Sequence, residues 1–240
     1  MITIMVPAFN EELYLLDAVN SIVRAGQIEN IELDIIIVND GSRDNTQDII
    51  NDLEKKYEFV RSIHNVRNLG MGTSLLKVIK IAKGDKFLIL PGDGDISEGD
   101  IIKMFANMNK AEMVFLYYLN KEMRGRFRNV ISLLYNAIHI MVFDIYVQYI
   151  SGPCIYPMKK MRELKLKSKR LSIVAEISIK LLSLGCTYCE VSGHMQKGKI
   201  GSNAISINNL LEVSISFIKL LIEIKIKKRR LYNKVPVRAQ

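Results

Sequence analysis

The residues best placed to do chemistry in this 240-residue chain are two carboxylates that follow a short apolar run. Residues 87–90 are all apolar and predict a buried strand; Asp93 and Asp95 follow, separated by Gly94. Carboxylates this close repel each other unless a cation lies between them. Hard cations such as Mg²⁺ or Mn²⁺ prefer oxygen ligands and leave room for substrate phosphates. The pair predicts a metal–diphosphate site, with a plain Asp/Gly-rich turn as the alternative.

Two further carboxylates follow earlier apolar segments of the same kind. Residues 2–6 and 33–38 are predicted strands; Glu11 lies in the loop after the first, and Asp40 comes shortly after the second. A third, short strand is expected at residues 59–63. Apolar residues at helical spacing between these segments predict crossover helices, and therefore a parallel α/β sheet. Because ligands bind at the carboxyl edge of such sheets, we expect the acidic groups to form a sugar-nucleotide site there.

Four short motifs in this order resemble those of family 2 glycosyltransferases. They are Val-Pro-Ala-Phe-Asn-Glu, Val-Asn-Asp-Gly-Ser, Asn-Leu-Gly-Met-Gly and Asp-Gly-Asp, at residues 6–11, 38–42, 68–72 and 93–95. Within the family, the chain is most similar to dolichol-phosphate mannosyltransferases and bacterial polyprenyl-phosphate glycosyltransferases. The resemblance covers about residues 1–202. It implies a Rossmann-like, three-layer α/β/α sandwich of the GT-A glycosyltransferase fold, and transfer of a sugar from a nucleotide-diphosphate-sugar with inversion at the anomeric carbon.

The resemblance also implies roles for individual residues. Asp93 and Asp95 would hold the metal ion, Mg²⁺ or Mn²⁺, together with the donor diphosphate, and they are the predicted catalytic carboxylates. The nucleotide sugar would be bound by residues from all four motifs, namely Pro7, Phe9, Glu11, Asp40, Asn68, Asp93 and Gly94.

The acceptor side departs from the pattern of the polyprenyl-phosphate enzymes. Those enzymes usually have Gly-Ser-Arg after the strand expected at residues 113–116, where this chain has Leu-Tyr-Tyr at residues 116–118. Gln148 stands where they commonly have an aspartate. Arg124 is our candidate for the missing arginine, with Arg126 as a further possibility. The resemblance still implies a membrane-associated polyprenyl phosphate, dolichyl or undecaprenyl, as the expected acceptor, and these departures keep a saccharide hydroxyl as the alternative.

A second group on the acceptor side matches the family in its spacing. Arg128 and Ser132 are four residues apart, and therefore share one face of a helix. The resemblance assigns both to the lipid phosphate, whereas a solvated polar face is the alternative. A polyprenyl phosphate is already ionised near pH 7 and needs no general base. A saccharide hydroxyl, as in cell-surface polysaccharide synthesis, would need a carboxylate base, and Glu176 is our candidate.

The positive charge of the chain is concentrated near its C-terminus. The formal net charge is +9, and residues 195–240 hold ten lysines and arginines against two glutamates. Residues 210–222 are largely apolar at helical spacing, and a basic cluster follows at residues 225–230. This pattern is typical of an amphipathic helix on an anionic membrane, with a homodimerisation helix as the alternative. We therefore expect a glycosyltransferase domain at residues 1–202 and an amphipathic helix with a basic tail at residues 203–240.

Composition argues against several other classes of protein. No uncharged apolar run is long enough to span a bilayer, and three cysteines suit a reducing compartment, so a cytoplasmic protein peripheral to the membrane is expected. Nucleic acid is not an expected partner, because the basic clusters at residues 155–170 and 225–230 contain only one aromatic residue, Tyr156. A nucleotidyltransferase usually has a glycine-rich, arginine-containing loop after its first strand, and residues 7–10 are Pro-Ala-Phe-Asn.

Overall fold

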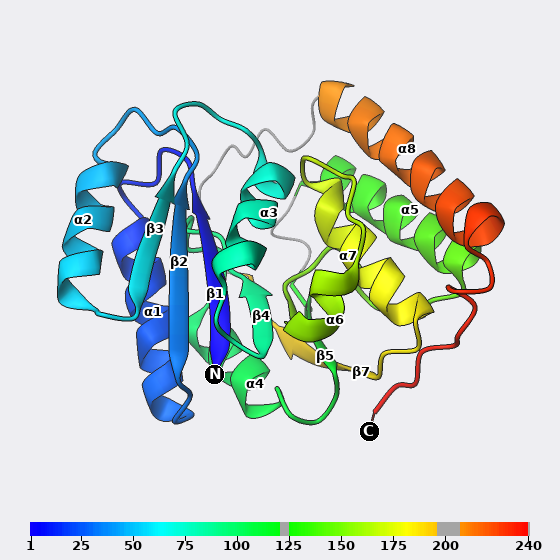
Figure 1. The fold of residues 1–240 in the computed structure, drawn as a ribbon, viewed down its shortest axis with the longest axis horizontal. Coiled ribbons are helices and arrows are strands. Elements are labelled where there is room, and N and C mark those ends of the chain that lie inside the picture. The colour runs from blue at the N-terminus through cyan, green and yellow to red at the C-terminus, as the bar shows by residue number, and fades with distance from the viewer. Residues whose placement is uncertain (121–124, 196–206, 240) are drawn as a thin grey trace.

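The computed structural model describes residues 1–120, 125–195 and 207–239. In these residues the chain forms a seven-stranded sheet with the order β3-β2-β1-β4-β6-β5-β7 (Figure 1). The strands are β1 (Ile2–Ala8), β2 (Leu33–Asn39), β3 (Val60–His64), β4 (Lys86–Ile89), β5 (Met113–Tyr118), β6 (Cys154–Pro157) and β7 (Tyr188–Gly193).

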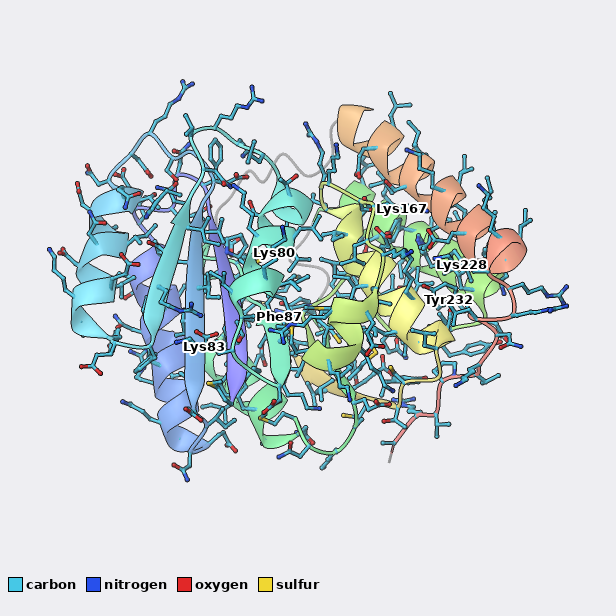
Figure 2. All side chains as sticks on the ribbon, in the orientation of Figure 1. Lys80, Lys83, Phe87, Lys167, Lys228 and Tyr232 are labelled. Atoms are coloured by element: carbon cyan, nitrogen blue, oxygen red, sulfur yellow. The ribbon has the colours of Figure 1, made fainter. Side chains whose placement is uncertain are left out.

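Helices cover both faces of this sheet, so the predicted three-layer α/β/α arrangement is confirmed. The helices are α1 (Leu15–Ile28), α2 (Thr46–Lys56), α3 (Met71–Ile81), α4 (Glu98–Ala106), α5 (Arg126–Phe143), α6 (Met158–Glu163), α7 (Ser172–Ser183) and α8 (Ile207–Leu221), followed by the π-helical segment η2 (Ile222–Lys227). Helices α1, α2 and α4 pack on one face, and α3, α6 and α7 on the other (Figure 1). Phe87 of β4 is fully buried on the face of the sheet that α3, α6 and α7 cover (Figure 2).

The central strands are parallel and almost completely buried, as continuous apolar runs predict. β1 pairs with β2 from Ile2 opposite Leu33 to Ala8 opposite Asn39, and it pairs with β4 on its other side. The carboxyl ends of β1, β2 and β4 therefore lie next to one another, which places the loops that follow them at one edge of the sheet.

One strand runs against the predicted parallel direction. β6 is antiparallel to β4, with Tyr156 opposite Phe87, and antiparallel to β5, with Ile155 opposite Val114. The buried Tyr156 hydroxyl forms a hydrogen bond of 3.0 Å with the hydroxyl of Ser178 on α7. The sheet is therefore mixed, and β4 and β5 end at the same edge because both run antiparallel to β6.

The C-terminal segment packs into the same core as the rest of the fold. The Phe217 ring of α8 lies 4.9 Å from that of His139 and 5.8 Å from that of Phe143, both on α5. The amide of Ala239 donates to the carbonyl oxygen of Tyr188 at 2.7 Å, which joins the tail to β7. The predicted boundary at residues 202 and 203 falls outside the described residues and stays a prediction. Within the described residues, no helix combines the length and the apolar character that a membrane crossing requires.

Candidate active site

The acidic turn after β4 is brought to the edge of the sheet because β4 and β1 remain hydrogen-bonded beyond the end of the strand. The amide of Leu90 donates to the carbonyl oxygen of Met5 at 3.0 Å, and the amide of Gly92 donates to that of Pro7 at 3.1 Å. Pro7 therefore lies directly beside the turn formed by residues 92–95.

The turn itself holds the two predicted metal ligands close together. The amide of Asp95 donates to Oδ1 of Asp93 at 3.2 Å, and Gly94 between them has a φ of +74°, which favours glycine. Both aspartates are partly exposed. Among the described residues, no group of three or more His, Cys, Asp or Glu is placed to hold a metal ion. Since Mg²⁺ is commonly bound through one or two carboxylates plus substrate phosphates, the Asp93–Asp95 pair fits such an ion bound with a diphosphate.

The loop after β1 is fastened to the loop after β2. The amide of Asn10 donates to the hydroxyl of Ser42 at 3.0 Å, and the amide of Glu11 donates to that of Thr46 at 2.8 Å. In return, the side-chain oxygen of Asn10 accepts from the amide of Arg43 at 2.8 Å. These contacts between loops were not predicted from the sequence, and they hold Glu11 beside the turn that follows Asp40.

Asp40 is nearly buried, and both oxygens of its carboxylate are engaged. Oδ1 accepts from the side-chain amide of Asn65 at 2.8 Å and from the backbone amide of Leu69 at 2.9 Å, while Oδ2 accepts from the amide of Gly70 at 3.0 Å. Asp40 therefore holds the glycine turn in which the exposed Asn68 lies. This is a positioning role that the sequence analysis did not assign to it.

We expect the substitution Asp40→Ala to weaken binding of a nucleoside diphosphate, and not only of the sugar. Loss of the carboxylate leaves the amides of Leu69 and Gly70 without their acceptor, which we expect to cost about 1–3 kcal/mol of binding free energy as the turn loosens. Titration calorimetry with the nucleoside diphosphate measures this cost. Asp52→Ala on α2, where the side chain is 77% exposed, is the matched control. Equal affinity of Asp40→Ala and the wild type would refute the assignment.

The predicted acceptor residue Ser132 lines a small pocket at the same edge of the sheet. The pocket lies next to the end of β5, and its lining comprises Tyr118, Asn129, Ser132, Leu133, Asn136, Gln148, Tyr149 and Met195. The side-chain amide of Asn136 donates to the carbonyl oxygen of Val147 at 3.1 Å and thus holds the segment that carries Gln148. Arg124 lies outside the described residues, and only the backbone of Arg128 is described, so their predicted roles stay predictions.

Glu176 occupies a position that does not suit the predicted general base. It is 4% exposed on α7, and its carboxylate accepts from the ammonium of Lys180 at 2.6 Å. It also accepts from the backbone amides of Lys167 at 3.1 Å and Ser168 at 2.8 Å. A general base needs a lone pair directed at the acceptor hydroxyl, whereas the oxygens of Glu176 are occupied within the protein. The geometry thus gives Glu176 a structural role, in which it holds the backbone of Lys167 and Ser168 and pairs with Lys180.

The mixed sheet and the loops at its carboxyl edge define an α/β domain of the GT-A-like glycosyltransferase fold. Residues 3–163 match the family model described as glycosyl transferase family 2. The chain belongs to this family, as its motifs predicted.

Comparison with known proteins places this chain among diverse glycosyltransferases. A probable glycosyltransferase of Bacillus subtilis is 29% identical over 118 residues, which are 49% of this chain and 25% of that protein. A dolichyl-phosphate beta-glucosyltransferase of Trichomonas vaginalis is 28% identical in an alignment 123 positions long, and the alignment covers 47% of this chain and 36% of that protein. This chain therefore spans between a quarter and about a third of the length of these two relatives.

Among solved structures, the glucosyl-3-phosphoglycerate synthase of Mycobacterium tuberculosis has the same fold. Its complex with Mn²⁺, uridine diphosphate and glucosyl-3-phosphoglycerate superposes with a TM-score of 0.65. The alignment covers 93% of this chain and 79% of that one, at 16% identity. At this identity the likeness shows the fold alone.

Proposed function

We propose that this chain is an inverting, metal-dependent glycosyltransferase that moves a hexose from a nucleotide-diphosphate-sugar to a polyprenyl phosphate at a membrane surface. The observation that carries the proposal is the convergence of the β1, β2 and β4 loops at one edge of the sheet. It brings Pro7 beside the acidic turn and fastens Glu11 to the loop after Asp40.

On the donor side, the base and the diphosphate would be bound by different loops. Phe9 is 44% exposed at the edge of the sheet, and an exposed aromatic ring there is suited to stacking on a nucleobase. Asp93 and Asp95 would hold Mg²⁺ or Mn²⁺. When bound there, the ion would neutralise the charge that develops on the leaving diphosphate.

On the acceptor side, the pocket lined by Ser132 would receive the phosphate of the lipid. Hydroxyl and amide groups line it, and Arg128 comes one helical turn before Ser132 on α5. A phosphate oxygen needs no general base, which agrees with the engagement of Glu176 inside the protein. The second candidate acceptor is a saccharide hydroxyl, which is favoured by the Leu-Tyr-Tyr sequence at residues 116–118 in place of Gly-Ser-Arg.

A transfer assay tests the proposal and separates the two acceptors. The protein is incubated with Mn²⁺ and each of a set of radiolabelled nucleotide sugars. The acceptor is either undecaprenyl phosphate in anionic vesicles or a saccharide added to the same vesicles without the lipid phosphate. After extraction with organic solvent, we expect label from one donor to be found in the organic phase with the lipid. Label found only on the saccharide would favour the second candidate. Absence of product with every donor would contradict both.

Helices α5 and α8, together with η2, expose apolar surface that supports docking on a membrane. On α5 the exposed apolar residues are Phe127, Val130, Leu133, Leu134, Ile138 and Met141. On α8 and η2 they are Leu211, Ile215, Ile218, Ile222 and Ile226. The exposed basic side chains of Lys225, Lys227, Arg229 and Arg230 follow closely, so this surface combines apolar and cationic groups as an anionic membrane surface requires.

We expect the protein to co-sediment with anionic vesicles and not with neutral ones, and less strongly at high salt. Each basic residue near an anionic surface contributes about 1 kcal/mol, so Arg229→Glu/Arg230→Glu should weaken binding by at least about 2 kcal/mol. The matched control is Lys55→Glu/Lys56→Glu on the exposed face of α2. Substitutions are preferable to truncation here. Leu220 of α8 and Ile224 of η2 are buried, so deletion of this segment would expose the core that they pack against. Equal binding to both kinds of vesicle would contradict the electrostatic part, and binding to neither would favour dimerisation.

A further inference from the structure

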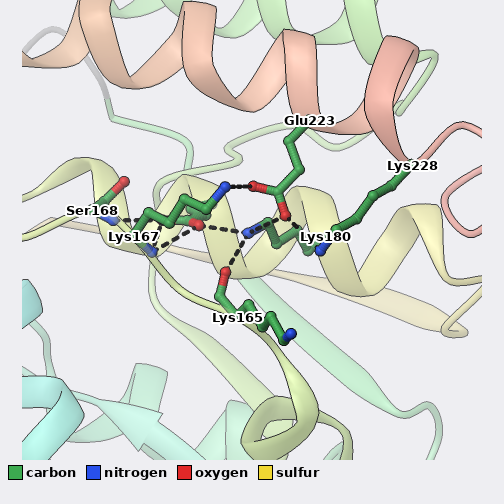
Figure 3. A network of polar contacts seen from close by, with 7 residues as sticks. Lys165, Lys167, Ser168, Lys180, Glu223 and Lys228 are labelled. Atoms are coloured by element: carbon green, nitrogen blue, oxygen red, sulfur yellow. Dashed lines mark hydrogen bonds and ion pairs between the residues drawn. The ribbon is translucent and has the colours of Figure 1, made fainter.

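A buried network of charges joins α7 to the C-terminal segment of the chain (Figure 3). At its centre is Lys180, whose side chain is fully buried. Its ammonium lies 2.6 Å from a carboxylate oxygen of Glu176 and 3.3 Å from one of Glu223, and it donates to the carbonyl oxygen of Lys165 at 2.7 Å. Removing either carboxylate would leave the buried ammonium of Lys180 with too little negative charge around it.

Glu223 is the carboxylate that the C-terminal segment contributes to this network, and the whole network lies beyond residues 3–163, the segment matched by the family model. Glu223 lies on η2, is 3% exposed, and contacts the ammonium groups of Lys167 at 2.7 Å and Lys228 at 3.1 Å. Burial alone would raise the pKa of Glu223, but the hydrogen bonds from Lys167 and Lys228 and the charge of Lys180 lower it to about 2. The carboxylate is therefore ionised at neutral pH and neutralises the cations around it.

The network fixes the backbone of the loop at residues 164–171, which leads into α7. The carboxylate of Glu176 accepts from the amides of Lys167 and Ser168, while Lys167 also reaches Glu223 through its side chain. Both ends of the network therefore contact the same short stretch of this loop.

The same loop presses on the glycine turn of the predicted donor site. The amide of Thr73 donates to the carbonyl oxygen of Lys169 at 3.2 Å. A Cβ atom at Gly72 would lie only 2.6 Å from the carbonyl oxygen of Ser168, so no other residue fits there without moving the loop. Gly70 has a φ of +85°, and a Cβ there would lie 3.0 Å from the carbonyl oxygen of Lys169. The turn is thus held between this loop and Asp40.

We propose that Glu223, acting through Lys180 and Glu176, is a positioning residue for donor binding. It holds the loop at residues 164–171 against the glycine turn and so fixes the turn beside Asp40. A buried ion pair seldom stabilises a fold more than apolar groups of the same size would. We therefore ascribe to this network the positioning of the loop through its directed hydrogen bonds. The inference rests on the proposed function, since it concerns affinity for the donor nucleotide, and it gives the C-terminal segment a part in the donor site.

Glu223→Gln tests the proposal, with uridine and guanosine diphosphates plus Mn²⁺ as binding probes and the transfer assay for kinetics. We expect the Kd of the bound nucleotide and the KM for the donor to rise about fivefold, with kcat changed by less than about twofold. Gly72→Ala moves the same loop from the other side and should give the same pattern.

The matched control is Asp34→Asn, which removes a buried carboxylate at the opposite edge of the sheet. Asp34 is 4% exposed and accepts from Arg61 at 2.6 Å and from the hydroxyl of Thr3 at 2.8 Å. This variant should lose stability without a change in nucleotide affinity. A rise in Kd of equal size in Asp34→Asn and Glu223→Gln would show a general loss of stability and would overturn the inference.

Hydrogen exchange of the ligand-free protein separates this inference from the proposed function. In Glu223→Gln, the amides of Leu69, Gly70 and Thr73 should exchange faster, whereas in Asp34→Asn they should exchange as in the wild type. Unchanged exchange at these amides would overturn the inference, whatever the protein binds. A further outcome is that the wild type binds no nucleotide while these amides exchange faster in Glu223→Gln. This outcome would refute the proposed function, and with it the role of Glu223 in donor binding.

Discussion

Replacing Asp95 by alanine should abolish sugar transfer and remove the metal-dependent part of nucleotide binding, while the fold persists. The side chain is partly exposed in a turn beyond the end of β4, so its removal leaves no cavity in the core. Losing one of the two carboxylates would cost several kcal/mol of stabilisation of the leaving group, or about a thousandfold in rate. The measurements are kcat/KM for transfer and the nucleotide Kd with and without Mn²⁺.

Asp85→Ala is the matched control for this experiment. Asp85 precedes β4 at its other end, and its side chain is 93% exposed. This variant should keep full activity and metal dependence. Full transfer activity of Asp95→Ala, or of the wild type in excess chelator, would contradict the assignment of the acidic turn.

Acidification should remove stability that Glu223 provides at neutral pH. Its pKa is lowered from an ordinary value of 4.5 to about 2 in the folded protein. Above pH 4.5 the carboxylate is ionised in both the folded and the unfolded state, and its contribution is fully present. Between pH 4.5 and 2 the unfolded state takes up a proton that the folded state does not, so stability is lost as the pH falls. The full contribution is about 3 kcal/mol.

Urea unfolding of the wild type and Glu223→Gln at pH values above and within this window measures the effect. The difference in the free energy of unfolding should be largest at the higher pH and should shrink as the pH falls. Glu190→Gln is an informative control, because burial raises the pKa of Glu190 and its pH-dependent contribution has the opposite sign. A difference between wild type and Glu223→Gln that does not change with pH would contradict the assignment.

The parts of the fold that could be predicted are those whose own residues form a recognisable pattern in the sequence. β1, β2 and β4 are buried parallel strands, which appear in a sequence as continuous apolar runs, and each leads toward a carboxylate. β6 was not predicted, because it has only four residues, ends at Pro157 and lies between strands that are distant in sequence. Its antiparallel direction is decided by the strands on either side of it.

The donor site was predictable in outline because its residues follow strand ends. The contacts that fix it were not, since the hydrogen bonds from Asn10 to Ser42 and from Glu11 to Thr46 join residues more than thirty positions apart. For Glu176 a local signal was present. Lys180 lies four residues further on, one turn along the same face of an otherwise uncharged helix, and this spacing favours an ion pair. The partner that completes the network, Glu223, comes from a distant segment and could not be read from this pattern.

The apolar periodicity near the C-terminus predicted a helix, and α8 forms over Ile207–Leu221, but the sequence did not show which of its apolar residues pack into the core. Phe217 contacts the aromatic rings of α5 and Leu220 is buried, whereas Ile215 and Ile218 are exposed. The sequence pattern predicts an amphipathic helix, and only the packing shows which of its apolar residues remain available to a membrane or a second copy.

The most direct test of metal-dependent nucleotide-sugar binding is the melting temperature of the wild type with each of a set of nucleotide sugars, in Mn²⁺ and in excess chelator. A ligand at a hundred times its Kd stabilises the folded state by about 2.7 kcal/mol, which for a chain of this size is about 5–10 °C. We expect one donor to raise the melting temperature by several degrees in Mn²⁺ and much less in chelator. No rise with any nucleotide sugar in Mn²⁺, or an equal rise in chelator, would contradict the account.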